Sequence, residues 1–553
     1  MKMAPLPFLL GVMAAALISV CVWKFLGAPV ELVDAPAGKV HCVSYTPYRG
    51  SEAPFIPGFR ADPANIDADF AQLTKITDCV RIYSVDLGLD AAVPLAAKHN
   101  MQVLLGIWIG FSEEFNQRQI AKAITVANAN PKAIRAIIVG NEVLLRGEQS
   151  AEDLTRYIGQ VKEATGLPVT YADVTHFWLE APQALADAVD FITIHILPYW
   201  ENDPTPAEGG VAYLDQVRRE AAAHFPDKRI FIGETGFPSA GRQREGAVPS
   251  IVSQARYISE FADYAETHDL DYNLIEAYDQ PWKRAQEGTV GGAWGFFTTE
   301  RKSKFHWTGP VSEHPKWRTE AGYAFVFSLA ILLIMAFRGG KPEALGGLGI
   351  GFGAGFAGSA LVLQYEHSLM AWRTPLEGVV EIFVFAMSLA VIVFVLPEIT
   401  KKRAGIAPLS IFKTLSWMRR PTRAGLGTAL YLGLTQLAVT FSALVVSLGL
   451  SFDNRYRDFP LAAFAIPAVS FALLAFNRGD QKRAGTNRRE EVTFSLLFIL
   501  SAGLIAYNEG PLNSEALTWC LLNLIFVLPW AGSCWATLKG LVVKPAAVAS
   551  TSA

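Results

Sequence analysis

The chain has 553 residues, of which 51% are hydrophobic and 18% charged, with a formal net charge of −3. It is too apolar for one water-soluble domain and too long for one hydrophobic core. The balanced charge and the five cysteines argue against a nucleic-acid-binding protein, a disordered chain and a disulfide scaffold.

Charge is unevenly distributed along the chain. Residues 38–319 contain 27 Lys and Arg and 36 Asp and Glu, whereas residues 320–553 contain 19 and 13. In the second stretch the charges lie between apolar runs long enough to span a membrane. The sequence therefore predicts a soluble domain joined to an all-α polytopic membrane domain. The expected parts are an anchor and linker (1–37), the soluble domain (38–310), a juxtamembrane linker (311–320), about seven membrane helices (321–540) and a tail (541–553).

The N-terminus is a long apolar run. Lys2 precedes Pro5 to Phe25, and no small-residue cleavage pattern directly follows the run, although Ala35-Pro36-Ala37 lies nearby. An uncleaved membrane anchor is therefore preferred over a cleaved signal peptide.

Eight short β-rich runs then alternate with helix-like segments such as Phe115 to Ala127 and Ile251 to Thr267. Eight such units in roughly 280 residues predict an α/β fold, the (β/α)8 TIM barrel. An open doubly wound sheet is the alternative, but it would need a glycine-rich phosphate turn where Ser44 to Tyr48 stands, so no cofactor is expected. The runs are Val40–Tyr45, Val80–Ser84, Gln102–Ile109, Ala136–Gly140, Pro168–Tyr171, Phe191–Ile196, Arg229–Gly233 and Tyr272–Ala277.

The cysteines and histidines give little chemistry. Cys42 and Cys79 fall on the first two strands, where a disulfide and two free thiols both remain open, because neighbouring parallel strands do not readily meet disulfide geometry. The nine histidines are scattered, and neither HExxH nor CxxC occurs, so no metal site is expected.

Seven further apolar runs follow the soluble stretch, near 321–337, 344–364, 376–396, 425–450, 459–476, 492–507 and 516–537. With the anchor they make eight expected spans. Alternate loops carry 17 Lys and Arg, whereas the opposite short loops carry only Arg373, Arg455 and Arg457. By the positive-inside rule both termini are expected in the cytoplasm and residues 28–320 on the far side, which in a Gram-negative cell is the periplasm.

Two glutamates stand where barrel enzymes carry their chemistry, at the carboxyl ends of strands. Asn141-Glu142 follows the fourth run, and Glu234 follows the seventh. Either glutamate alone would be read as a solvated loop residue. Two carboxylates facing one another across a barrel mouth are what glycoside cleavage requires.

At these residues the sequence resembles glycoside hydrolase family 17, the β-1,3-glucanases and related glucanosyltransferases. The matching segments are 139–142, 233–241 and 276–283. The resemblance implies that Glu142 is the general acid/base and Glu234 the nucleophile of a retaining reaction, and that Asn141 bonds the sugar 2-hydroxyl. It also places Glu276 and Lys283 near the acidic pair, where a cation could keep Glu234 ionised.

Other residues near the strand ends are candidates for binding or support. Sugar faces stack on aromatic rings, so we expect several of six aromatics to line sugar subsites. Arg81 is expected to be a charge partner at the barrel mouth, and His195 a hydrogen-bonded structural residue. The six aromatics are Tyr45, Trp108, Tyr199, Trp200, Trp282 and Trp294.

A glycosyl-enzyme can pass its sugar to water or to a sugar hydroxyl. The membrane spans favour transfer, because an enzyme that branches or closes a nascent glucan must stand beside an inner-membrane synthase. The layout resembles bacterial membrane proteins of the NdvC type, associated with periplasmic cyclic β-(1,3),(1,6)-glucan. We therefore expect a glucanosyltransferase of the bacterial inner membrane that contacts lipid, β-glucan and a synthase, but no nucleic acid. The alternatives are a membrane-bound endo-β-1,3-glucanase and a non-catalytic glucan-binding transporter or sensor.

Overall fold

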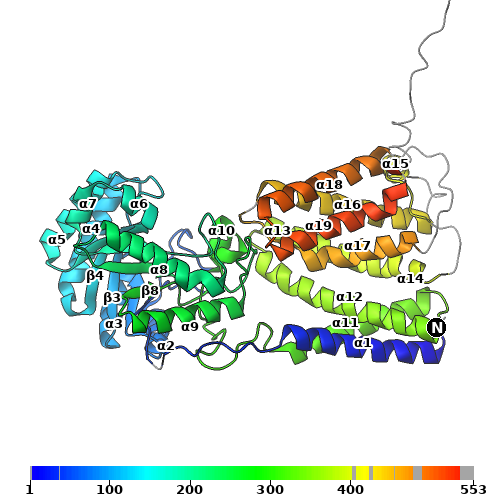
Figure 1. Ribbon diagram of the computed structural model, residues 1–553, viewed down its shortest axis with the longest axis horizontal. Coiled ribbons are helices and arrows are strands. Elements are labelled where there is room, and N and C mark those ends of the chain that lie inside the picture. The colour runs from blue at the N-terminus through cyan, green and yellow to red at the C-terminus, as the bar shows by residue number, and fades with distance from the viewer. Residues whose placement is uncertain are drawn as a thin grey trace, which may run out of the picture. The chain divides into compact units, whose positions relative to one another are not determined.

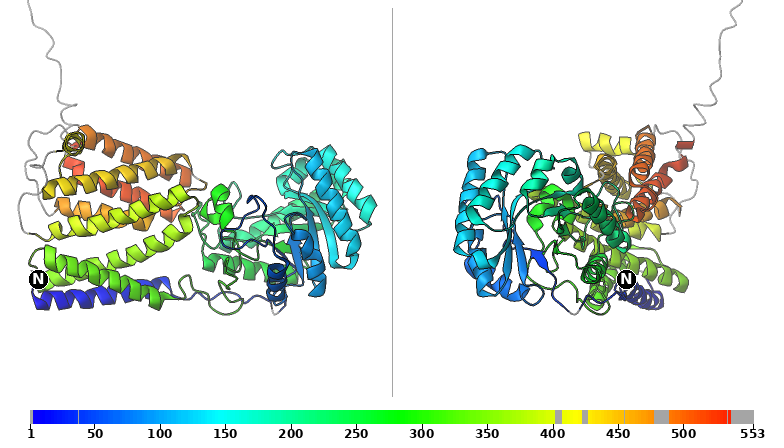
Figure 2. Two further views of the ribbon diagram at one scale, coloured as in Figure 1. Left: turned by 180° about the vertical axis from the view of Figure 1, so that it is seen from behind. Right: turned by 60° about the vertical axis from the view of Figure 1, so that its left-hand side comes forward.

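The computed structural model describes residues 3–36, 38–401, 407–421, 427–453, 455–476, 489–532 and 534–535. The chain forms two compact units (Figures 1 and 2). One unit is Pro29–Glu313. The other combines Met1–Ala28 with His314–Ala553.

The first unit is the predicted (β/α)8 barrel. Its eight strands are parallel and close in sequence order, with the first paired to the last. The strands are β1 (Cys42–Ser44), β2 (Cys79–Ile82), β3 (Gln102–Ile107), β4 (Ile134–Asn141), β5 (Val169–Val174), β6 (Ile192–His195), β7 (Ile230–Thr235) and β8 (Tyr272–Leu274).

Helices follow the strands and cover the barrel (Figure 1). Helix α5, for example, is capped by the Ser150 hydroxyl and buries Leu154, Tyr157, Ile158 and Val161, a spacing that places one apolar stripe against the sheet. The helices are α2 (Pro63–Leu73), α3 (Ala92–Lys98), α4 (Glu113–Ala129), α5 (Ala151–Thr165), α6 (Thr175–Glu180), α7 (Gln183–Ala188), α8 (Ala207–His224), α9 (Ile251–Thr267) and α10 (Arg284–Gly291).

Side chains alternate between the two faces of the closed sheet. Val80 and Ile82 of β2 belong to the large core between strands and helices. Cys79 belongs instead to a small separate core with residues of the other strands. The small core contains Cys42, Cys79, Leu104, Ala136, Ile138, Ala172, Phe191 and Phe231.

A disulfide joins Cys42 to Cys79, which answers the question left open by the sequence. The register pairs Val43 with Val80, so the two cysteines lie directly opposite each other on β1 and β2. Their Cα atoms are 4.4 Å apart, at the short end of the range that a disulfide tolerates.

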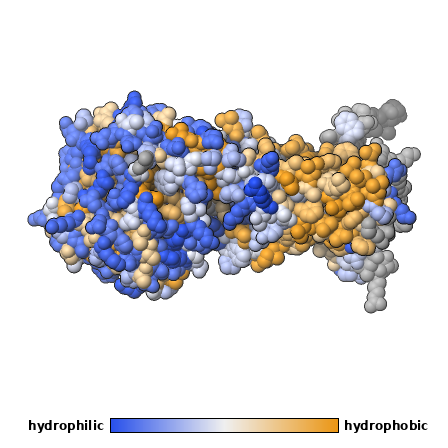
Figure 3. Space-filling model, turned by 90° about the horizontal axis from the view of Figure 1, so that it is seen from below, coloured by the Kyte–Doolittle hydropathy of each residue, from blue (hydrophilic) through white to orange (hydrophobic). Residues whose placement is uncertain are grey.

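The second unit is helical, as predicted, and much of its surface is apolar (Figure 3). Among the described residues, six helices are long and apolar enough to cross a membrane: Pro5–Leu26 (α1), Trp317–Arg338 (α11), Ala344–Ala371 (α12), Pro375–Ile399 (α13 to α14), Thr428–Phe452 (α16) and Arg489–Glu509 (α18). Two shorter apolar helices, Leu461–Phe476 (α17) and the segment Ser514–Trp530 that begins with α19 (Ser514–Val527), occupy the remaining two predicted spans. A short helix, α15 (Ile411–Arg419), lies between the fourth and fifth long helices.

Glycines on one face of α12 bring that helix close to α1. A Cβ at Gly347 would lie 2.3 Å from the Pro7 carbonyl oxygen, and one at Gly351 would lie 2.2 Å from the Gly11 carbonyl oxygen. Gly355 meets Ile18 in the same way. This four-residue spacing of glycines is typical of closely packed membrane helices.

Candidate active site

The end of β4 carries Asn141 and Glu142 on an irregular backbone. The pairing of β4 with β5 shifts between Ile138 and Asn141, and Gly140 has φ +87°. A side chain at Gly140 would meet Val143 Cγ2 at 2.8 Å, so glycine is required there for both conformation and space. The irregular turn places Glu142, whose φ is +54°, at the mouth of the barrel.

A bulge in β7 directs Glu234 toward the same point. Phe231 faces the barrel interior and Thr235 faces outward, where its hydroxyl bonds Tyr257 of α9. The pairings of β7 with β6 and with β8 both shift near Gly233 and Glu234. Strand β7 therefore has one extra residue between Phe231 and Thr235. Gly233 and Glu234 can therefore both face inward, and Glu234 is only 5% exposed.

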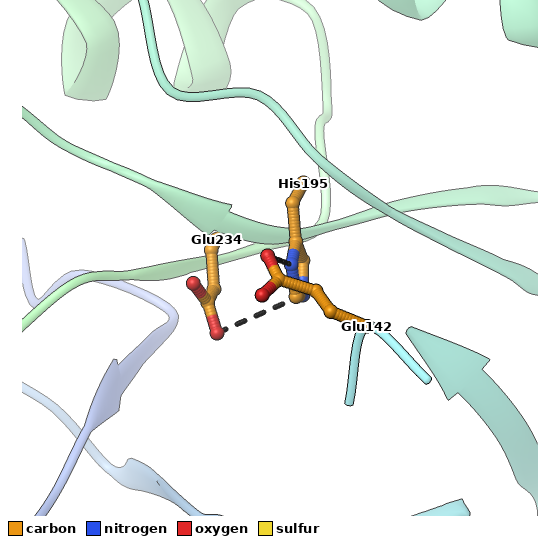
Figure 4. Close-up of side chains that lie close together, drawn as sticks. All are labelled: Glu142, His195 and Glu234. Carbon is orange, nitrogen blue, oxygen red and sulfur yellow. Dashed lines mark hydrogen bonds and ion pairs between the residues drawn. The ribbon is translucent and has the colours of Figure 1, made fainter. Parts of the chain in front are cut away.

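His195, at the end of β6, lies between the two carboxylates (Figure 4). Its Nδ1 is 2.9 Å from Glu142 Oε1, and its Nε2 is 3.7 Å from Glu234 Oε1. One oxygen of each glutamate and one ring nitrogen all lie within 4.8 Å of one another. A Cβ at Gly233 would lie 2.5 Å from Thr193 Cγ2 and 3.0 Å from His195 Cδ2, so glycine leaves room for the imidazole.

Hydrogen bonds hold Glu234 in place. The Tyr83 hydroxyl donates to Glu234 Oε1 at 2.8 Å, and Arg81 Nη1 lies 3.3 Å from the same oxygen. Burial and the adjacent Glu234 carboxylate hold the pKa of Tyr83 well above its usual value, so the phenol keeps its proton. Arg81 also donates to Asn141 Oδ1 at 2.5 Å, which links the two strand ends and confirms a buried cation at the barrel mouth.

The Glu142 carboxyl is set for ionisation in the free site. Burial favours the protonated form, but the hydrogen bond from His195 and the charges of His195, Arg146 and Arg81 outweigh it, so the pKa of Glu142 is lowered. Arg146 Nη1 lies 3.9 Å from Glu142 Oε2. The free site therefore favours the ionised Glu142 carboxylate.

A buried ion pair, Lys283 with Glu276, lies near the two carboxylates. Lys283 Nζ lies 3.0 and 3.1 Å from the two oxygens of Glu276, which is 1% exposed. Burial raises the pKa of Glu276 to about 7, although Lys283 opposes the shift. Burial also raises the pKa of Glu287, and the charges of Glu142 and Glu234 add to that rise. Lys283 is thus the cation that offsets several neighbouring acids.

Three of the predicted aromatic residues are partly exposed. The Arg146 guanidinium lies over the Trp108 ring at 4.7 Å. Trp200 is stacked with Trp294, with ring centroids 6.4 Å apart and planes 21° apart. Trp282 donates through Nε1 to Gln280 at 2.8 Å. Each of the three rings keeps part of its surface exposed.

The other three aromatics are buried. Tyr45 is completely buried, and its hydroxyl donates to Asp69 Oδ2 at 3.1 Å. Tyr199 is also completely buried, and its hydroxyl donates to the Arg242 carbonyl at 2.7 Å. Trp294 is 2% exposed. Burial does not support a sugar-contacting role for Tyr45 or Tyr199, because both rings pack in the large hydrophobic core of the barrel.

Sequence reasoning missed three groups beside the carboxylates. His195 was expected only to support the fold, and neither Tyr83 nor Glu287 was singled out. A sequence signal was present for His195, because it falls in the sixth β-rich run, and the sixth and seventh strands are neighbours in a (β/α)8 barrel. Glu287 lies on α10, beyond the strand ends, where no strand pattern points to it.

Residues 42–295 match the BtgE/BtgC glycoside hydrolase domain. The match lies within the barrel unit, Pro29–Glu313. The chain is similar to a putative glucan endo-1,3-beta-glucosidase btgC of Aspergillus niger, with 29% identity over 46% of this chain and 40% of that protein. It is also similar to a glucan 1,3-beta-glucosidase of Arthroderma benhamiae, with 28% identity over 44% of this chain and 84% of the relative.

Among solved structures, the chain is similar to an active-site mutant of Rhizomucor miehei beta-1,3-glucanosyltransferase in complex with laminaritriose. That similarity has 24% identity, covers 48% of this chain and 95% of the other, and has a TM-score of 0.42. The chain thus spans about two fifths of the Aspergillus relative's length, and the matches to both relatives cover less than half of this chain.

Proposed function

We propose that the barrel is a retaining glycosidase in which Glu234 is the nucleophile and Glu142 the general acid/base. The carrying observation is the closeness of the two carboxylates, which have oxygens within 4.8 Å of each other. Retaining enzymes place the two carboxyl groups about 5–5.5 Å apart, whereas inverting enzymes need about 6.5–9.5 Å to fit a water. The spacing supports the retaining route.

In the first step, Glu142 donates a proton to the glycosidic oxygen as Glu234 attacks the anomeric carbon. The bond to the leaving sugar breaks and a glycosyl ester forms on Glu234. In the second step, Glu142 removes a proton from an acceptor hydroxyl, which attacks the anomeric carbon and releases Glu234. Tyr83 and Arg81, both in contact with Glu234, stabilise it as a carboxylate leaving group.

The proposed substrate is a β-1,3-glucan. The support is the two glucosidase relatives and three partly exposed aromatic side chains near the strand ends, Trp108, Trp200 and Trp282, on which sugar faces can stack. Asn141, held by Arg81, is the proposed partner of the sugar 2-hydroxyl. Glu276 and Lys283 support the site through charge rather than through substrate contact, because Glu276 is buried.

We favour sugar transfer over hydrolysis because the described part of the chain contains six helices long and apolar enough to cross a membrane. Such anchoring suits an enzyme that forms β-1,6 linkages or branches on a glucan emerging from an inner-membrane synthase. The asymmetry of Lys and Arg in the loops supports cytoplasmic termini and a periplasmic barrel. The remaining candidates are a membrane-bound endo-β-1,3-glucanase, favoured by the relatives' names, and a barrel that binds glucan without cleaving it.

The test is to give the purified full-length protein a laminari-oligosaccharide and to follow the products by mass and linkage. Transfer predicts products longer than the donor that carry 1,6 bonds. Only shorter products at every donor concentration would leave the endoglucanase. A Glu234→Gln variant that works as well as the parent would leave the non-catalytic binder.

A further inference from the structure

A second cluster of ligand-type side chains lies in the helical unit. His314 precedes α11, Glu320 lies in the first turn of α11, and Glu366 lies near the end of α12. One ring nitrogen and one oxygen from each carboxylate all lie within 4.8 Å of one another. The side chains are largely buried, His314 being 20% and Glu320 16% exposed.

Contacts within the protein do not satisfy this cluster. Glu320 Oε2 is buried and has no hydrogen-bond partner among the residues that the structure describes. The nearest His314 nitrogen, Nδ1, is 3.8 Å from that oxygen, which is longer than a hydrogen bond. Buried carboxylate oxygens without partners are rare and call for a missing ligand, water or ion. The two like charges of Glu320 and Glu366 also repel each other unless a cation lies between them.

The imidazole is held in position by a neighbouring ring. Trp23, completely buried near the end of α1, meets His314 edge to face, with ring centroids 5.1 Å apart. A histidine whose plane is fixed by packing loses little freedom on binding a ligand through its nitrogen. The three candidate ligands thus come from separate segments, and one of them is pre-oriented.

We propose that His314, Glu320 and Glu366 bind one divalent transition-metal ion, with Zn²⁺ the best match to the ligand set. Imidazole nitrogen with carboxylate oxygen suits Zn²⁺, whereas Ca²⁺ and Mg²⁺ prefer oxygen ligands alone. Zn²⁺ bonds of about 2.0 Å separate tetrahedral ligand atoms by about 3.3 Å, so small side-chain rotations close the site. The ion would fasten the segment before α11 to α11 and α12. This inference does not depend on the proposed function of the barrel.

The sequence gives no motif for this site, because its ligands are spread over two helices and the segment before them. Another cluster among the described residues has a similar arrangement of ligand atoms. Glu142, His195 and Glu234 likewise bring three ligand atoms within 4.8 Å, although each of those carboxylates has protein partners. An experiment on metal binding must therefore separate the two clusters.

The full-length protein in detergent is stripped with EDTA, titrated with Zn²⁺, passed through a desalting column and analysed for metal. We expect about one Zn²⁺ per chain. A variant with His314→Ala and Glu366→Gln should bind Zn²⁺ at least tenfold more weakly, whereas one with Glu142→Gln and Glu234→Gln should keep it. Co²⁺ as a visible probe should show a low-coordinate absorption band in the parent that is lost only in the first variant.

A matched surface control is His176→Ala with Glu180→Gln, which removes an exposed histidine and carboxylate 3.5 Å apart and should change nothing. Parent protein that binds no Zn²⁺ or Co²⁺ would overturn the proposal and leave a proton-bridged cluster. Loss of the metal only on changing Glu142 and Glu234 would assign it to the barrel and overturn the proposal equally. If the His314 and Glu366 variant does not fold, the Glu142 and Glu234 variant still decides, because Zn²⁺ that it keeps is bound outside the barrel cluster.

Discussion

Replacing His195 by Asn tests the electrostatics of the proposed acid/base. His195 Nδ1 is 2.9 Å from Glu142 Oε1, and it heads the causes that lower the pKa of Glu142 against burial. Without the imidazole, burial remains and its main opponent is gone, so the pKa of Glu142 should rise. A hydrogen bond to a charged group contributes about 1.5–3 kcal/mol, and 1.36 kcal/mol corresponds to one pKa unit, so the rise is about one to two units.

The assay is the pH dependence of kcat/KM on a laminari-oligosaccharide. Glycosylation needs protonated Glu142, so kcat/KM falls as pH rises through the pKa of Glu142 in the free enzyme. A raised pKa moves that falling limb to higher pH by about one to two units. The exposed His176→Asn is the control and should leave the profile in place. An unchanged limb in the His195 variant, or one that moves to lower pH, would refute the reasoning.

Three further changes probe the structure. Lys283→Met leaves Glu276 buried without its cation, which should lower the free energy of unfolding by about 3–5 kcal/mol at pH 8. The loss should be smaller at pH 5, because burial raises the pKa of Glu276 to about 7 and the carboxyl is then already neutral. Equal losses in thermal melts at the two pH values would contradict this. Opening the Cys42–Cys79 disulfide, which spans 37 residues, should lower barrel stability by about 4 kcal/mol, and melts with and without reductant would measure it. Gly351→Ala should destabilise the helical unit because of the Gly11 carbonyl, whereas Gly349→Ala, with nothing within 4 Å, should not, and two variants that melt alike would refute the packing.

The barrel and the helical unit could be predicted because periodic patterns report them directly. Eight β-rich runs and eight apolar runs appear at the observed positions, and strand ends point to Glu142 and Glu234. The bulge in β7 could not be predicted, because it depends on the registers of β6 and β8 as well as on Gly233 itself. Sequence spacing alone does not show which way Glu234 faces.

The burial of individual aromatic side chains could not be predicted from the sequence either. Tyr45 and Trp108 both come directly after a strand, yet one ring is sealed against Asp69 and the other is partly exposed beneath Arg146. The difference depends on which other segments pack against each ring, and residue type does not reveal that. The same limit hid the His314 cluster, whose members come together only when α11 and α12 pack.

The central claim, a covalent intermediate on Glu234, is tested most directly by trapping it. The full-length protein is incubated with a 2-deoxy-2-fluoro laminaribiosyl donor that carries a good leaving group, and the intact mass and the labelled peptide are determined. We predict one added glycosyl group per chain on the peptide that contains Glu234, and no label on that peptide in a Glu234→Gln variant. A label on any other residue, or turnover of the donor with inverted configuration and no covalent adduct, would contradict the account.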